Sequence, residues 1–204
     1  MSDLEAVVRR ILLNLQEQGA RFAVVGLSMG GFVAQLLALK APERVSALVL
    51  LCTTSGGPEF KKLFPSMTEE QVRAIYGMDP LARVQAALAP EICPLLKKRY
   101  PEVYEYVVDV RTRMPEDPVQ VMLQFLAVSD FMERTLPLED LRCPVLILTG
   151  DRDPLVPLGN AELLQKRIEN AELRVIGDTD HLFFLERRDE VAAIINSFFI
   201  GSGI

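Results

Sequence analysis

The sequence lacks the features that would assign it to several broad classes of protein. Across its 204 residues no run of lysine or arginine is long enough to bind phosphates along a stripe, and the formal net charge is −6. Nucleic acid is therefore not expected as a partner. The longest apolar runs, 47–52 and 145–148, fall far short of the roughly 20 residues that a membrane span needs. The sequence therefore predicts no transmembrane segment.

Signals for export and for disulfide bonding are missing as well. The first residues contain no basic stretch followed by an apolar one, so no secretory signal is predicted and a cytoplasmic location is expected. The three cysteines, Cys52, Cys93 and Cys143, form no C-x-x-C pair and show no metal-ligand spacing. We interpret them as reduced thiols, with Cys52 and Cys143 in the core.

At its two ends the chain does contain an alternation of apolar strands and helices. Four apolar segments predict buried strands, at 22–25, 45–51, 143–149 and 172–176. Helices are predicted between and beside them, at 3–18, 32–40, 158–169 and 189–199. Because strand, helix, strand is typical of a parallel sheet with both faces covered, we expect an α/β fold with about four strands.

The middle of the chain has a different composition. From residue 59 to about residue 138 we find no convincing parallel strand, only helical pieces interrupted by prolines. The segment 104–108 resembles a short strand, but its charge spacing favours a helix. The most apolar piece, 119–132, is expected to contact the sheet or to roof a pocket. We predict a core of residues 1–55 and 139–204 with an inserted helical cap of residues 56–138.

One stretch carries a motif with chemical meaning. Residues 24–35 indicate a buried strand that runs through a Gly-x-Ser-x-Gly turn at 26–30 into a helix. Such a turn lifts the serine hydroxyl out over the strand ends and tolerates only small residues on either side. Ser28 is therefore a candidate nucleophile.

Two further strand ends supply groups that would complete a catalytic set. Asp153 follows the third predicted strand, and His181, the only histidine, follows the fourth. The carboxyl ends of parallel strands meet at one edge of a sheet, where such folds place their sites. The order serine, acid, histidine is the one expected when the serine lies in such a strand-to-helix turn, known as a nucleophile elbow. The histidine would take the serine proton, and the carboxylate would orient the ring and stabilise its charged form.

Several carboxylates compete for the role of the acid. Asp151 adjoins the turn glycine and suits local bonding within its loop, whereas Asp153 leads into the next helix. Asp178 and Asp180 are further candidates. No carboxylate follows the second strand before Glu59, so the acid is not expected there. We select Asp153.

Three stretches together resemble the α/β-hydrolase superfamily: GLSMGG at 26–31, GDRDPLVP at 150–157 and DHLFFLE at 180–186. The elbow with its trailing Gln35 resembles the branch that contains 3-oxoadipate enol-lactonases and related carboxylic ester hydrolases. The segment between the sheet portions would correspond to the variable cap of that family. As a set, the three motifs are specific for the superfamily, but they say little about the individual substrate, because caps and loops decide it.

The resemblance implies a serine hydrolase that cleaves an ester or lactone of a small carboxylic acid through an acyl-enzyme, without a cofactor. Ser28 would be the nucleophile, His181 the base, Asp153 the orienting acid and the Met29 N–H an oxyanion donor. Perhydrolysis, amide cleavage and C–C bond hydrolysis use similar machinery and stay open. Dehalogenation is disfavoured, because in this superfamily it uses an aspartate at the position of Ser28.

The sequence departs from the family pattern at two places. Asp180 stands where the family usually has a glycine before its histidine, and a second carboxylate there would bias the ring toward its charged form. In the family several strands precede the elbow strand, and a loop after one of them supplies a second oxyanion donor. Here only one predicted helix precedes the strand at 22–25, and we identify no source for that donor.

The strand at 22–25 is therefore expected to expose an apolar edge that drives self-association or needs another segment to cover it. Three explanations compete: an incomplete chain, which we favour, a compact natural form, and a homo-oligomer that completes the sheet. The alternative functional hypothesis is a binding or oligomerisation module that retains Ser28, Asp153 and His181 but has lost efficient catalysis.

Overall fold

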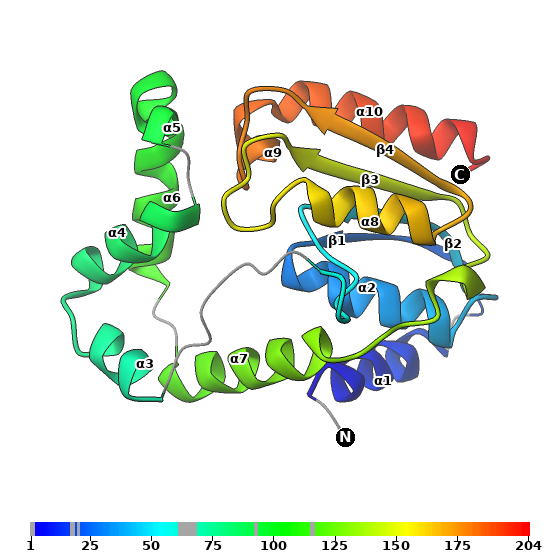
Figure 1. Cartoon of the computed structure of the whole chain (residues 1–204), viewed down its shortest axis with the longest axis horizontal. Coiled ribbons are helices and arrows are strands. Elements are labelled where there is room, and N and C mark those ends of the chain that lie inside the picture. The colour runs from blue at the N-terminus through cyan, green and yellow to red at the C-terminus, as the bar shows by residue number, and fades with distance from the viewer. Residues whose placement is uncertain (1–2, 17–18, 20, 61–68, 92–93, 115–116) are drawn as a thin grey trace.

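A four-stranded parallel sheet organises the protein (Figure 1). The computed structural model describes residues 3–16, 19, 21–60, 69–91, 94–114 and 117–204. The strands lie in the order of the chain, as β1 (Phe22–Leu27), β2 (Val45–Leu51), β3 (Val145–Gly150) and β4 (Ala171–Ile176). Each neighbouring pair is parallel. The predicted α/β class is confirmed, and all four predicted strands are present.

Helices cover both faces of the sheet. One face packs against α2 (Met29–Lys40) and α8 (Gly159–Arg167), with α1 (Asp3–Gln16) packed on α2, and the other face packs against α9 (Phe183–Glu186) and α10 (Arg188–Gly201). Side chains alternate between the faces of a strand. In β2, accordingly, Leu48 and Leu50 join the first core cluster, while Val49 and Leu51 join the second. Burial on both faces explains why β2 and β3 are almost continuously apolar.

All regular elements in the described part of the segment between β2 and β3 are helices. They are α3 (Glu69–Tyr76), α4 (Pro80–Glu91), α5 (Pro94–Arg99), α6 (Pro101–Arg113), α7 (Pro118–Met132) and the short 3₁₀ helix η1 (Leu138–Asp140). The prediction of helix at 104–108 is confirmed by α6. Prolines begin α4 to α7, because proline at the first helical position gives up no hydrogen bond.

Two aspartates cap these proline-started helices. The Asp79 Oδ1 accepts hydrogen bonds from the N–H groups of Leu81 and Ala82 at the start of α4. Asp117 accepts one from the Val119 N–H at the start of α7. At these two positions, an aspartate followed by a proline marks where the helix starts.

The helices of this segment contact two different parts of the protein. Phe131 of α7 stacks on Phe32 of α2, with ring centroids 4.2 Å apart and an interplanar angle of 9°. The helices α4, α5 and α6 pack instead against Leu182 and the start of α9. The division into a core and an inserted cap stays a prediction, with boundaries at residues 55/56 and 138/139.

The strand β1 lies at one edge of the described sheet, next to β2 only. Val25 and Leu27 in this strand are exposed. Self-association through this edge stays a prediction.

Among the described residues, no helix combines the length and the apolar character that crossing a bilayer requires. Cys93 lies outside the described residues, and Cys52 and Cys143 are buried and unpaired as predicted.

The stacked pair between α2 and α7 predicts a stability effect. Phe131 is 1% exposed and Leu126, on the same helix, is 59% exposed. Replacing Phe131 by alanine should lower the free energy of unfolding by about 3–5 kcal/mol, because it leaves a cavity against Phe32. Leu126→Ala should change it by less than about 0.5 kcal/mol. Urea unfolding measures both, and equal losses in the two variants would contradict the packing described.

Candidate active site

Ser28 occupies a strained turn between β1 and α2. Its backbone has φ 49° and ψ −119°, in the left-handed half of conformational space, which costs a non-glycine residue about 1–3 kcal/mol. The Ser28 N–H donates to the carbonyl of Leu51, and the Thr53 hydroxyl donates to the Ser28 carbonyl, both at 2.8 Å. The last residue of β2 and a residue just after it therefore bind the backbone N–H and the carbonyl of Ser28.

Close packing of glycines makes this turn possible. A Cβ at Gly26 would lie 2.7 Å from the Cα of Gly31, and a Cβ at Gly31 would overlap the buried side chain of Thr53. A Cβ at Gly30, by contrast, would meet no atom within 4 Å. The expectation that both flanking positions need a small residue therefore fits Gly26, whereas the crowding on the other side falls at Gly31.

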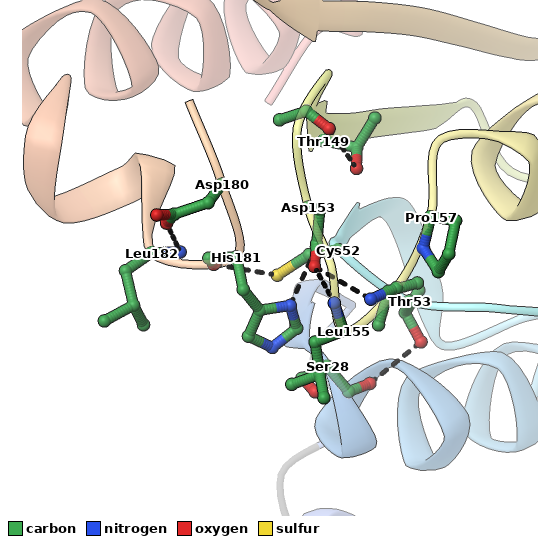
Figure 2. A network of polar contacts seen from close by, with 12 residues as sticks. Ser28, Cys52, Thr53, Thr149, Asp153, Leu155, Pro157, Asp180, His181 and Leu182 are labelled. Atoms are coloured by element: carbon green, nitrogen blue, oxygen red, sulfur yellow. Dashed lines mark hydrogen bonds and ion pairs between the residues drawn. The ribbon is translucent and has the colours of Figure 1, made fainter. Parts of the chain in front are cut away.

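Asp153 and His181 form a buried hydrogen-bonded pair (Figure 2). The His181 Nδ1 lies 2.8 Å from the Asp153 Oδ2, and both residues are 5% exposed. The Asp153 Oδ1 accepts hydrogen bonds from the N–H groups of Leu155 and Val156, each at 2.8 Å. Burying a carboxylate is costly unless its oxygens are hydrogen-bonded. The turn after β3 and the ring of His181 together meet that requirement.

The three predicted residues lie at the same edge of the sheet. In Figure 2 the ring of His181 lies between Asp153 and Ser28, and its second nitrogen is on the Ser28 side. Among the hydrogen bonds of the described residues, none joins the Ser28 hydroxyl to this ring. Contacts between a nucleophile and its base are often long before a substrate binds. The arrangement is compatible with a Ser-His-Asp catalytic triad.

The other aspartates considered from the sequence have different partners. The Asp151 Oδ1 accepts a hydrogen bond from the Thr179 N–H, across to the loop after β4. Asp178 forms ion pairs with two arginines. Asp180 is fully buried, and its Oδ1 accepts a hydrogen bond from the Leu182 N–H. Of the four, Asp153 is the carboxylate that contacts the His181 ring.

Cys52 contributes to this site in a way that the sequence did not suggest. It follows β2 directly and has a positive φ of 39°. Its thiol donates to the His181 carbonyl at 3.5 Å. Burial, followed by the negative charge of Asp153, raises the pKa of this thiol well above its usual range. The only sequence signal was its place at the carboxyl end of a buried strand, the edge where Ser28 and Asp153 also lie.

Cys52, Asp153 and His181 also form the one group of potential metal ligands within the described residues. Their ligand atoms lie within 4.8 Å of one another. Metal binding between these three side chains would need a Cys52 thiolate and a free Nδ1 on the ring, because Nδ1 is the ring nitrogen next to Asp153. Here the thiol is stabilised in its protonated form, and the Nδ1 of the ring is bonded to Asp153. Hydrogen bonding accounts for the arrangement of all three side chains.

The start of α2 supplies a backbone donor beside Ser28. Met29 is the first residue of this 12-residue helix, and the N–H groups of a first helical turn have no acceptor within the helix. Oriented peptide dipoles make such a terminus favourable for negative charge. Gln35, further along α2, is fully buried and donates to the carbonyls of Gly31 and Thr54. It therefore ties the helix to the loop after β2.

Glu186 is a half-buried carboxylate at the end of α9. Burial, followed by the negative charge of Asp180, raises its pKa from 4.5 to about 7. The Asp180 amide and the charges of Arg99 and Arg187 oppose this rise. The Glu186 Oε1 has no hydrogen-bond partner within the described structure. The folded protein therefore holds the proton of this side chain more tightly than the unfolded chain does.

The two glycines of the turn allow a matched test. Gly31→Ala should lower the free energy of unfolding by about 1–3 kcal/mol, because the new methyl group forces Thr53 away from its bond to Ser28. Gly30→Ala should be neutral or stabilise the helix by up to about 1 kcal/mol. Denaturant unfolding compares the two. Equal stability of the two variants would show that Gly31 is not the crowded position.

The raised pKa of Glu186 predicts a pH dependence of stability. A carboxyl that is harder to ionise in the folded state stabilises it fully below pH 4.5, and this contribution is lost as the pH rises toward 7. Wild-type stability should therefore fall relative to that of Glu186→Gln across this window. Urea midpoints from acid to neutral pH measure the difference. The exposed Glu190→Gln serves as control and should follow the wild type; a constant gap for Glu186→Gln would contradict the assignment.

Known proteins resemble this chain in sequence. The model of the alpha/beta hydrolase family matches residues 1–194. A poly(3-hydroxyalkanoate) depolymerase from Ectopseudomonas oleovorans is 33% identical over 181 residues, which are 86% of this chain and 59% of the depolymerase. A pimeloyl-[acyl-carrier protein] methyl ester esterase from Nitrosomonas europaea is 30% identical over 173 residues, which are 81% of this chain and 66% of the esterase. The chain thus spans about three fifths to two thirds of these relatives.

Solved structures show the same fold. A hydrolase from Pseudomonas aeruginosa PA01 superposes with a TM-score of 0.81 at 26% identity, covering 97% of this chain and 72% of that protein. The superfamily resemblance predicted from the three sequence stretches is confirmed, while the finer resemblance to the enol-lactonase branch stays a prediction. With a family match that covers nearly its whole length, this chain belongs to the alpha/beta hydrolase family.

Proposed function

We propose that this protein is a serine hydrolase that cleaves an ester or lactone of a small carboxylic acid through an acyl-enzyme. The observation that carries the proposal is the buried hydrogen bond between His181 and Asp153, at the sheet edge where Ser28 occupies a left-handed turn. A ring held by a carboxylate at Nδ1 keeps its other nitrogen available as a base. The names of the two relatives, a depolymerase and a methyl ester esterase, support ester chemistry.

In the proposed reaction the Ser28 hydroxyl attacks the acyl carbon and His181 accepts its proton. The bond from the acyl carbon to the leaving oxygen then breaks, and His181 returns the proton to that oxygen. Water attacks the acyl-enzyme by the same route, releasing the acid and restoring Ser28. Asp153 holds the ring and stabilises its charged form, and the Met29 N–H donates to the oxyanion. The steps use only groups of this chain and water.

The helical segment between β2 and β3 is proposed to act as the cap that shapes the substrate site. Its helices α4 to α6 pack on Leu182, the residue after His181. A cap in this position would contact a substrate bound near Ser28. This placement supports a role for α4 to α6 in selecting the substrate.

Replacement of the proposed nucleophile gives the direct test. The wild-type protein should hydrolyse p-nitrophenyl acetate or butyrate, and Ser28→Ala should reduce kcat to about a thousandth or less. A fluorophosphonate probe should label Ser28 in the wild type alone. Ser129→Ala removes an exposed serine on α7 and should retain full activity.

The same experiment decides between the hydrolase and the alternative hypothesis. Folded wild-type protein that neither turns over esters nor reacts with the probe would contradict the proposed function. If that protein also formed a concentration-dependent oligomer, the result would favour a binding or oligomerisation module.

A further inference from the structure

An arginine from the helical segment binds the loop that carries His181. Arg99 is the last residue of α5. Its Nη2 lies 2.7 Å from the Asp178 Oδ2, and its Nη1 donates to the Asp178 carbonyl at 3.1 Å. One guanidinium therefore holds both the side chain and the backbone of Asp178, a two-pronged geometry that only arginine provides.

Asp178 is also tied to the loop that carries Asp153. The Arg152 Nη2 lies 2.9 Å from the Asp178 Oδ1. The backbone N–H of Arg152 donates to the Thr179 carbonyl at 2.9 Å. Asp178 thus joins three segments: the end of α5, the loop after β3 and the loop after β4. Arg152 immediately precedes Asp153, and Asp178 stands three residues before His181.

The conformation of Asp178 indicates that these contacts hold the loop in a specific shape. Its φ is 60°, in the left-handed region that aspartate adopts only occasionally. On the other side of His181, Leu182 is buried against Leu88 and Leu96 of the helical segment. The histidine therefore lies between an ionic and an apolar attachment to the same set of helices.

We propose that Arg99 and Asp178 are positioning residues, which align the His181 ring with Ser28 by fixing the histidine loop to α5 and to the Asp153 loop. This inference rests on the proposed function. Both side chains are partly exposed, and ion pairs between exposed side chains add little to stability. Their effect should therefore fall on the geometry of the base rather than on folding.

Kinetics of matched arginine variants test the proposal. Arg99→Gln should lower kcat about tenfold, because small misplacements of a catalytic group are costly. KM should change by less than about twofold, since Arg99 does not bind the substrate. Arg99→Lys should recover part of the loss. Measurements are made well above pH 7, so that loss of the Arg99 charge does not alter the ionisation of Glu186.

The control is an arginine in the same segment with an equally short ion pair. Arg113 lies 2.7 Å from Asp109, four residues earlier on α6. Arg113→Gln should therefore leave both kcat and KM unchanged. If Arg99→Gln and Arg113→Gln behave alike, or if Arg99→Gln acts on KM alone, the proposal is wrong.

Because His181 is the only histidine, NMR of its ring provides a readout that needs no turnover. The wild type and Arg113→Gln should show one sharp set of imidazole signals. Arg99→Gln and Asp178→Asn should broaden or double these signals, while the urea midpoint stays near that of the wild type. Asparagine tolerates the left-handed conformation, so Asp178→Asn removes mainly the charge.

The combined results separate this proposal from the proposed function. Arg99→Gln and Asp178→Asn should be non-additive, so that the double variant is no worse than the more impaired single variant. An inactive wild type whose ring signals still respond to Arg99→Gln would overturn the hydrolase and retain the positioning role. An active wild type with unchanged ring signals in Arg99→Gln would support the hydrolase and overturn the positioning role.

Discussion

The buried carboxylate of Asp153 imposes the constraint on which the functional edge depends. A charge in the interior must have its oxygens hydrogen-bonded, and here the partners come from two separate loops. The turn through Leu155 and Val156 supplies two amides, and the loop after β4 supplies the ring of His181. Satisfying one side chain therefore constrains both loops, and with them the position of the only histidine.

Strain at this edge is compensated by contacts with the neighbouring strand ends. Ser28, Cys52 and Asp178 are the three non-glycine residues with positive φ in the described part of the chain, and each lies at or just beyond the end of a strand. Backbone or side-chain bonds from adjacent segments hold each of them. Family membership accounts for the fold, but many chemistries occur on it. The proposed ester hydrolysis depends on these particular contacts.

Local sequence predicted much of the architecture for identifiable reasons. β2 and β3 are buried on both faces, so their apolar runs were unambiguous. Asp153 was separable from Asp151 because their positions relative to the turn differ. Other features depend on residues far apart in the chain. The Cys52 thiol meets a carbonyl 129 positions away, and Arg99 meets Asp178 79 positions away. No periodicity or spacing encodes such pairs.

By itself, the sequence determined the order of strands and helices, the Gly-x-Ser-x-Gly turn and the three residues that strand ends would bring to one edge. These follow from hydrophobic pattern and turn chemistry, which act over a few neighbouring residues. Only the tertiary structure decided that Gly31, rather than Gly30, is the crowded glycine, and that a helix from the middle of the chain holds the histidine loop. Those outcomes depend on packing between segments, because a contact forms only where the fold brings both partners together.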